Sequence, residues 1–169
     1  ICLNYKTPEH ITPILNKLEE AGCNIKIEKG KIYMKAPKKI KAVDIKTMPY
    51  PGFPTDMQSI FASVLTVAKG TSVIVENIFE NRYRYTAELN KMGAKITTEG
   101  KTAVIKGVRK LSGATVKSTD LRGGACMVLA GLSAKETTTV TNVEYILRGY
   151  EKLDEKLNSL GAKITVQKD

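Results

Sequence analysis

Thr55-Asp56-Met57-Gln58 begins a segment that the chain repeats from Thr119-Asp120-Leu121-Arg122 onward. Each copy continues through an apolar run, a stretch rich in β-branched residues and an Arg. Each ends in Gly-Ala-Lys-Ile, at residues 93–96 and 161–164. A partial third copy precedes them, with Gly22-Cys23-Asn24-Ile25 in the place of Gly-Ala-Lys-Ile. A period of roughly 65 to 70 residues holds a whole supersecondary unit, so we expect the copies to pack side by side.

The residues before these glycines share one spacing. Apolar side chains stand one, four and eight positions before each Gly, as in Tyr85, Leu89 and Met92 before Gly93. The corresponding sets are Ile14, Leu18, Ala21 and Leu153, Leu157, Leu160. This spacing predicts three helices that each bury one face and end at a glycine in the left-handed conformation.

The segments between the helices have the composition of strands. Residues 71–75 and 137–141 are rich in β-branched residues, and Lys-Ile-Thr after each Gly-Ala pair starts another strand. Hairpins are expected to turn at Gly30 and Gly100. Thr55 with Gln58 has the pattern of a capping box, which predicts a helix over the apolar run 57–68. A complete unit therefore reads βαβαββ, and the fold class is mixed α/β, of the α+β type.

The chain has 169 residues, the size of one ordinary domain. We expect a single domain over residues 1–169, divided into a partial unit at about 1–40 and units at 41–108 and 109–169. No apolar stretch approaches the ~20 residues that span a bilayer. We therefore expect a soluble, cytoplasmic protein without a membrane partner.

Cysteine and histidine give little support for metal or nucleophile chemistry. Three cysteines, an odd number, argue against a disulfide framework, and Cys23 and Cys126 stand in apolar repeat positions typical of structural residues. With His10 as the only histidine, a zinc site or a Ser/His/Asp triad has little support. We expect no metal.

The charged residues are more informative than the net charge of +10. Only five of 27 basic residues are Arg, and all five lie between residues 82 and 148. Arg82 and Arg148 could each pair with a nearby Glu, at position 80 or 151, or the arginines could hold one anionic ligand. Asp56 and Asp120 could simply stabilise helix starts, or their carboxylates could converge with the arginines on one face.

A nucleic-acid-binding module is a further alternative that the positive charge permits. The lysines at positions 38, 39, 41 and 46 are not interleaved with aromatic residues, and the chain has no Trp. We therefore do not expect nucleic acid as a partner.

Several motifs together resemble the UDP-N-acetylglucosamine enolpyruvyl transferases, a family also called the UDP-N-acetylglucosamine 1-carboxyvinyltransferases. They are Pro49-Tyr50-Pro51-Gly52-Phe53-Pro54-Thr55-Asp56-Met57-Gln58, Ile78-Phe79-Glu80-Asn81-Arg82-Tyr83, Lys110-Leu111-Ser112-Gly113-Ala114, Thr119-Asp120-Leu121-Arg122 and Arg148-Gly149-Tyr150-Glu151. The resemblance covers nearly the whole chain. It implies βαβαββ units around a pseudo-threefold axis, as in the related shikimate-pathway transferases.

The resemblance also implies a reaction, the first committed step of peptidoglycan synthesis. Enolpyruvyl passes from phosphoenolpyruvate to a hydroxyl of UDP-N-acetylglucosamine with release of phosphate, without metal or organic cofactor. Matching positions imply that Asp56 accepts or orients the hydroxyl proton and that Ile78 lines the nucleotide-sugar site. Arg122 and Arg148 would hold phosphoenolpyruvate, and Asp120 and Arg82 would belong to the closing wall.

Some features of the family are different or absent here. Leu147 precedes Arg148 where the family commonly has Asp, and Gly123-Gly124 replaces bulkier small residues, which should loosen that helix start. A Lys-Asn pair and a loop with a Cys or Asp general acid lie upstream of the matched region in the family. We therefore expect this chain to be the C-terminal half of a two-domain enzyme, inactive without its N-terminal domain. A domain of a shikimate 3-phosphate enolpyruvyl transferase is the nearest alternative.

Overall fold

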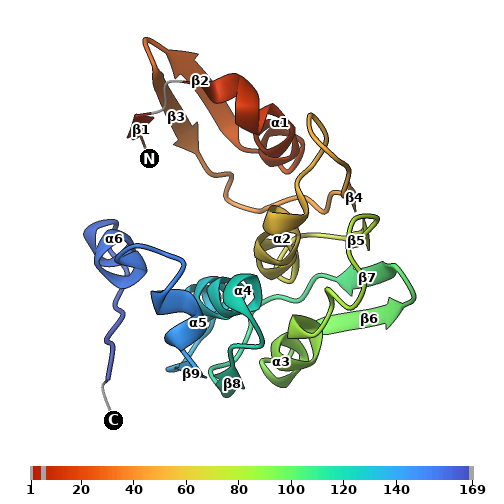
Figure 1. Ribbon diagram of the computed structural model, residues 1–169, viewed down its shortest axis with the longest axis vertical. Helices are drawn as coiled ribbons and strands as arrows, with labels where there is room; N and C mark the ends of the chain where they lie inside the picture. Colours follow the sequence, from red (N-terminus) through yellow and green to blue (C-terminus); the bar gives the residue numbers. More distant parts are fainter. Residues whose placement is uncertain (1, 5–6, 168–169) are drawn as a thin grey trace.

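A computed structural model describes residues 2–4 and 7–167, and these residues form three sheets. The first belongs to the partial unit and has the antiparallel order β1-β3-β2. A helix lies against it, shown in red at the top of Figure 1. The elements are β1 (Cys2–Asn4), the 3-10 helix η1 (Pro8–Ile11), α1 (Thr12–Glu20), β2 (Asn24–Glu28) and β3 (Lys31–Lys35).

The second unit is complete and follows the predicted βαβαββ order. Its elements are β4 (Ile45–Lys46), the 3-10 helix η2 (Thr55–Met57), α2 (Gln58–Leu65), β5 (Thr71–Val75), α3 (Tyr85–Lys91), β6 (Lys95–Glu99) and β7 (Thr102–Lys106). They form a sheet of order β4-β5-β7-β6. β4 and β5 are parallel because α2 connects them as a crossover, whereas the β6–β7 hairpin is antiparallel.

The third unit repeats only the first part of this sheet. Its elements are β8 (Thr115–Lys117), α4 (Leu121–Ser133), β9 (Thr139–Thr141), α5 (Glu144–Leu147) and α6 (Leu153–Ser159). β8 and β9 are parallel and α4 connects them, as α2 connects β4 and β5. α2 and α4 pack against each other at the centre of the molecule (Figure 1).

Matching hydrogen bonds confirm that the second and third units are copies. Asn90 brackets Ile96 through its side-chain amide, donating to its carbonyl at 2.9 Å and accepting from its N–H at 3.1 Å. Asn158 makes the same pair of bonds to Ile164, at 2.9 and 2.8 Å. The mixed α and β class predicted from the sequence is therefore confirmed, and the second and third units share this local pattern.

The core lies between the two central helices and the second sheet. Phe61 and Leu65 of α2, Met127 of α4, Leu89 of α3 and Ile74 of β5 are all buried in one cluster. Full burial of such a side chain contributes about 1.5 to 3 kcal/mol. The predicted face of α3 is confirmed, and the glycine that ends it has a φ of 86°.

The prediction that the third helix buries one face is wrong. Leu160 is 61% exposed, and α6 has no buried residue within Leu153–Ser159. Residues 162–167 form no strand, although the Lys-Ile-Thr pattern predicts one. In the second unit, the equivalent β6 pairs with β7 and α3 packs beside it. No described strand occupies the place of β7 in the third unit, so residues 162–167 have no partner strand and α6 has no sheet to cover among the described residues.

Within the described part of the chain, no helix is long and apolar enough to cross a membrane.

Candidate active site

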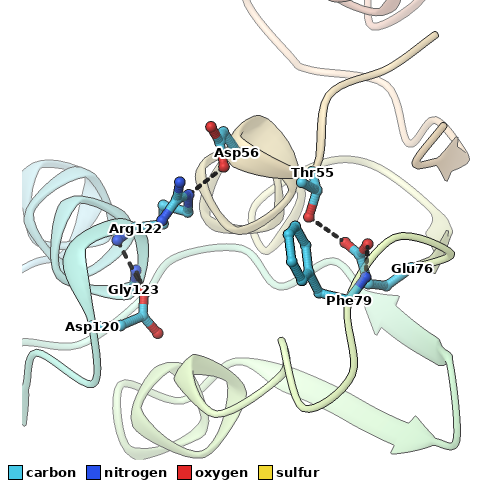
Figure 2. A network of polar contacts seen from close by, with 7 residues as sticks. All are labelled: Thr55, Asp56, Glu76, Phe79, Asp120, Arg122 and Gly123. Atoms are coloured by element: carbon cyan, nitrogen blue, oxygen red, sulfur yellow. Dashed lines mark hydrogen bonds and ion pairs between the residues drawn. The ribbon is translucent and has the colours of Figure 1, made fainter. Parts of the chain in front are cut away.

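Asp56 and Arg122 meet where the second and third units touch. Asp56 lies on η2 and Arg122 in the first turn of α4, and the guanidinium Nε donates to the carboxylate Oδ1 (Figure 2). This hydrogen bond raises the pKa of Arg122 and outweighs the opposing effect of burial. The Asp56 side chain is 60% exposed. A carboxylate and a guanidinium from two repeats therefore share an open edge, accessible to a ligand.

Asp120 begins α4. Its carboxylate Oδ1 accepts from the backbone N–H groups of Arg122 and Gly123, both at 2.9 Å. The Thr119 hydroxyl donates to Oδ2 at 3.2 Å. Asp120 is thus the N-cap that the sequence suggested as one of its two roles, and it fixes the turn that carries Arg122.

Asp56 does not cap its helix, and the predicted capping box at Thr55 is wrong. A 3-10 turn precedes α2, and no side-chain cap bond is present at the start of either. The Thr55 hydroxyl instead donates to Glu76 Oε2 at 2.9 Å (Figure 2). The hydroxyl that the local pattern predicted as a helix cap therefore donates to a buried carboxylate from another segment.

A small crevice lies between these groups. Its walls include Arg82, Asp120 and Arg122, together with the buried Gln58 and Tyr85. Burial is the main cause that raises the pKa of Tyr85 well above its usual range, so this phenol stays neutral. Three of the charged residues singled out from the sequence thus line one recess.

Arg82 and Arg148 do not form the ion pairs considered from the sequence. The Arg82 guanidinium lies 4.3 Å from the centre of the Phe79 ring. Arg148 directly follows α5 and lies 5.1 Å from the centre of the Tyr145 ring. Among the described ion pairs, Glu151 contacts Lys156. Both arginines therefore keep their donors free of carboxylate partners in the described part of the chain.

The segment that carries Arg148 lies beside the first turn of α4. A Cβ added at Gly149 would lie 3.0 Å from Leu121 Cδ2, so the backbone approaches the residue before Arg122 closely. Tyr150 is near enough for its ionisation to be affected by Arg122 and Asp56, although burial is the main cause that raises its pKa. Arg148 itself is exposed, and its guanidinium lies over the Tyr145 ring, whereas the next residue, Gly149, lies against Leu121 at the start of α4.

The glycines after Arg122 have a packing role. α4 begins directly after Asp120, and both Gly123 and Gly124 are buried. A Cβ on Gly124 would lie 2.6 Å from Ile146 Cγ1 of α5. Gly124 therefore allows α5, which precedes Arg148, to approach α4.

Sequence reasoning missed Glu76. It directly follows β5, is 1% exposed and accepts from the N–H of Ile78 at 2.8 Å. Its signal in the sequence is a lone carboxylate between a β-branched strand and the Ile78-Phe79 motif. Ile78 is partly buried at the start of the loop that Glu76 holds.

A larger hollow of about 430 Å³ lies elsewhere, between α3 and the β5–β7–β6 part of the second sheet. Its lining includes Asn90, Ile96, Val104 and Lys106. The Asn90 amide is already hydrogen bonded to Ile96, and the lining contains none of the acidic or Arg residues singled out above. We therefore place the candidate site at the charged edge rather than at the larger hollow.

Known proteins resemble this chain in sequence and in fold. The family model described as EPSP synthase (3-phosphoshikimate 1-carboxyvinyltransferase) matches residues 3–157. This chain belongs to the EPSP synthase family. The enolpyruvyl transferase NikO from Streptomyces tendae has the same fold, with a TM-score of 0.87 and 24% sequence identity over 97% of this chain and 39% of its own.

Within the family, closely similar curated relatives carry one name. The UDP-N-acetylglucosamine 1-carboxyvinyltransferase of Desulfofundulus thermocisternus is 51% identical over 164 residues, covering 97% of this chain and 68% of the relative. UDP-N-acetylglucosamine 1-carboxyvinyltransferase 1 of Caldanaerobacter subterraneus is 54% identical over 156 residues, 92% of this chain. The resemblance inferred from the motifs is confirmed. The chain spans 38% of the length of the Caldanaerobacter relative.

An EPSP synthase from Acinetobacter baumannii is more distant, with 22% identity and a TM-score of 0.68 over 90% of this chain and 36% of its own. The shikimate 3-phosphate alternative therefore has less support than the UDP-sugar enzyme.

Proposed function

We propose that this chain forms one wall of the active site of a UDP-N-acetylglucosamine 1-carboxyvinyltransferase. The intact enzyme, as we use the term below, is this chain joined to an N-terminal domain that supplies the opposite wall. It transfers enolpyruvyl from phosphoenolpyruvate to the sugar and releases phosphate in the cytoplasm, for peptidoglycan synthesis. The observation that carries the proposal is the 51% identity to the Desulfofundulus relative over 97% of this chain.

Asp56 is the acceptor for the proton of the sugar hydroxyl. Its carboxylate is exposed, lies on the turn that precedes α2 and is paired with Arg122, which lines the crevice. In the addition step, the hydroxyl oxygen forms a bond to the central carbon of the enol, and its proton passes to Asp56. The methylene carbon takes a proton from an acid on the other domain. A positioned carboxylate contributes about 10²- to 10⁴-fold to such a step.

The arginines hold the two anionic groups of phosphoenolpyruvate. Arg122 lies next to Asp56, Arg82 and Arg122 line the same crevice, and Gly149, which follows Arg148, lies against Leu121 at the start of α4. In the elimination step, the bond to the phosphate oxygen breaks, the methylene carbon loses a proton and phosphate leaves. Preorganised guanidinium groups stabilise the charge on the departing phosphate. Asp120 orients Arg122 through the cap, and Ile78 contacts the nucleotide sugar. Neither a metal nor an organic cofactor takes part.

Phosphate release from phosphoenolpyruvate is the direct test. With UDP-N-acetylglucosamine, we expect the intact enzyme to release phosphate and this chain alone to release none. Turnover by the chain alone would refute the division of the site between two domains. Release that depends on shikimate 3-phosphate instead would establish the alternative substrate, and salt-sensitive binding to nucleic acid without turnover would favour the binding module.

A further inference from the structure

Glu76 is an acidic residue buried without a cationic partner. Its side chain lies at the end of β5, and the residue is 1% exposed. Taking a carboxylate out of water costs several kcal/mol unless hydrogen bonds compensate. No ion pair involves it in the described part of the chain. Because burying this carboxylate is costly, we infer that Glu76 has a specific role.

Neutral donors from three segments surround the carboxylate. The hydroxyls of Thr47 and Thr55 donate to it at 2.8 and 2.9 Å. The backbone N–H groups of Ile78 and Phe79 donate to Oε1 at 2.8 and 3.2 Å. Figure 2 shows the carboxylate between Thr55 and Phe79. Glu76 therefore joins the turn that carries Asp56 to the loop that begins at Ile78.

The third unit shows that the fold itself does not require this carboxylate. The N–H of Thr47 donates to the Val75 carbonyl at 2.9 Å, and the N–H of Ser118 donates to the Thr141 carbonyl at the same distance. The residue after Val75 is Glu76, whereas Asn142 follows Thr141. The equivalent pair of parallel strands in the third unit thus forms without an acidic residue at this position.

The hydroxyls of Thr55 and Thr119 have different partners in the two copies. Thr119 donates to the carboxylate of the next residue, Asp120, at 3.2 Å. Thr55 donates instead to Glu76. Because a hydroxyl has one proton to donate, Thr55 cannot also donate to Asp56.

We propose that Glu76 is a positioning residue that keeps Asp56 available as the proton acceptor and holds Ile78 in place for the nucleotide sugar. It does so by taking the Thr55 hydroxyl and the two backbone N–H groups, without contact with substrate. The inference rests on the proposed function, because it concerns the roles of Asp56 and Ile78 in that reaction.

Glu76→Gln in the intact enzyme tests the proposal. The amide keeps the size of the side chain but has one acceptor oxygen. With that oxygen at the place of Oε1, the loop N–H groups keep a neutral and weaker acceptor, and the NH₂ group faces Thr55 and releases its hydroxyl toward Asp56. Because small displacements of reacting groups are costly, we expect kcat to fall roughly tenfold or more. We expect the KM for UDP-N-acetylglucosamine to rise, because Ile78, which contacts the nucleotide sugar, is held less firmly in place. The KM for phosphoenolpyruvate rises less, because the Asp120 cap still holds Arg122 and only Arg82, stacked on Phe79, lies on the affected loop.

Ser72→Ala is the matched control for lost stability. Ser72 lies on the same strand, is 0% exposed and accepts from the N–H of Val43 at 3.1 Å. Its loss leaves a buried N–H unsatisfied and costs about 1 to 3 kcal/mol far from the charged edge. We expect both KM values to stay at the wild-type level. The same split in Ser72→Ala as in Glu76→Gln would overturn the positioning role.

Thr55→Val added to Glu76→Gln separates the two parts of the mechanism. If the released hydroxyl binds Asp56, removing it restores part of kcat and leaves the KM for the sugar high. A further fall of kcat in the double variant would overturn the role assigned to the Thr55 hydroxyl.

Hydrogen exchange of this chain provides a readout that does not depend on turnover. We expect Glu76→Gln to speed hydrogen exchange at the Ile78 and Phe79 amides. Ser72→Ala should leave exchange at these amides unchanged. Unchanged exchange there would overturn the loop contact itself. Absence of phosphate release by the wild-type intact enzyme would instead refute the proposed function, whatever the exchange shows.

Discussion

The guanidinium of Arg122 donates to the carboxylate of Asp56, and the two residues stand in consecutive copies of one repeat. The contact joins α2 and α4 at the ends from which their catalytic candidates project. In a repeat protein, equivalent ends of neighbouring units come together, so charged residues at one position of each copy form a common edge.

Replacing Asp56 separates function from stability. The side chains of Asp56 and Arg122 are 60% and 31% exposed, and ion pairs this accessible contribute at most about 1 kcal/mol. We therefore expect Asp56→Asn to change the free energy of unfolding by less than about 1 kcal/mol and to lower kcat of the intact enzyme about 100-fold or more. Urea denaturation and phosphate release measure the two effects. A large loss of stability with normal kcat would assign the pair a structural role.

Replacing Asp120 should change the free energy of unfolding by an amount that depends on whether the new side chain can cap a helix. Its carboxylate caps α4, and Ala cannot cap whereas Asn can. We expect Asp120→Ala to lower the free energy of unfolding by about 1 kcal/mol and Asp120→Asn to leave it nearly unchanged. Urea denaturation of both variants decides this. Equal destabilisation would mean that the charge, not the cap hydrogen bonds, stabilises the helix.

Gly124 sets helix propensity against packing. Ala in place of a helical Gly gains about 1 kcal/mol from propensity, but a Cβ here would lie 2.6 Å from Ile146 Cγ1. Overpacking of a buried contact costs about 1 to 3 kcal/mol, so we expect Gly124→Ala to destabilise the protein. Gly100→Ala is not a suitable control, because the φ of Gly100 is 53° and Ala would be strained there. Leu132→Ala, at an exposed position of α4, is the control for a substitution by Ala in the same helix. Thermal unfolding that shows Gly124→Ala more stable than wild type would contradict this packing.

Glu88 gives stability a predictable pH dependence. Burial raises its pKa, but hydrogen bonds from Lys91 Nζ and from the backbone N–H of Lys117 outweigh burial, so the pKa lies below its ordinary 4.5. A lowered pKa in the folded state stabilises the protein above the unfolded value, and this is lost as pH falls through the folded value. We expect Glu88→Gln to be destabilised at pH 7 and to approach wild type below pH 4.5. A pH-independent difference in urea denaturation would contradict it.

Local patterns predicted the elements whose causes are local. Helical spacing and a terminal glycine specify α3, and Leu89 and Met92 are buried because this helix packs beside β6. The same spacing fails at Leu160, since burial also needs a partner sheet, which the pattern cannot report. Thr55 illustrates a third case, because its cap pattern is local while its actual partner, Glu76, is 21 residues away.

The candidate site was predictable where repetition marked it. Asp56, Asp120 and Arg122 stand at the openings of two copies, and the fold brings them together. The direction of the Arg148 side chain was not predictable, because a ring on the same short helix competes for its guanidinium.

Arg122→Lys in the intact enzyme tests most directly whether this edge binds the phosphorylated enol acid. Lys keeps the charge but loses the planar fork of donors, and a charge-assisted hydrogen bond contributes about 1.5 to 3 kcal/mol. We expect kcat/KM for phosphoenolpyruvate, measured as phosphate release with UDP-N-acetylglucosamine, to fall about 10- to 100-fold. Arg84→Lys, at an exposed position outside the crevice, should stay within about twofold of wild type. Equal kcat/KM values for the two variants would contradict the assignment of this edge as the substrate site.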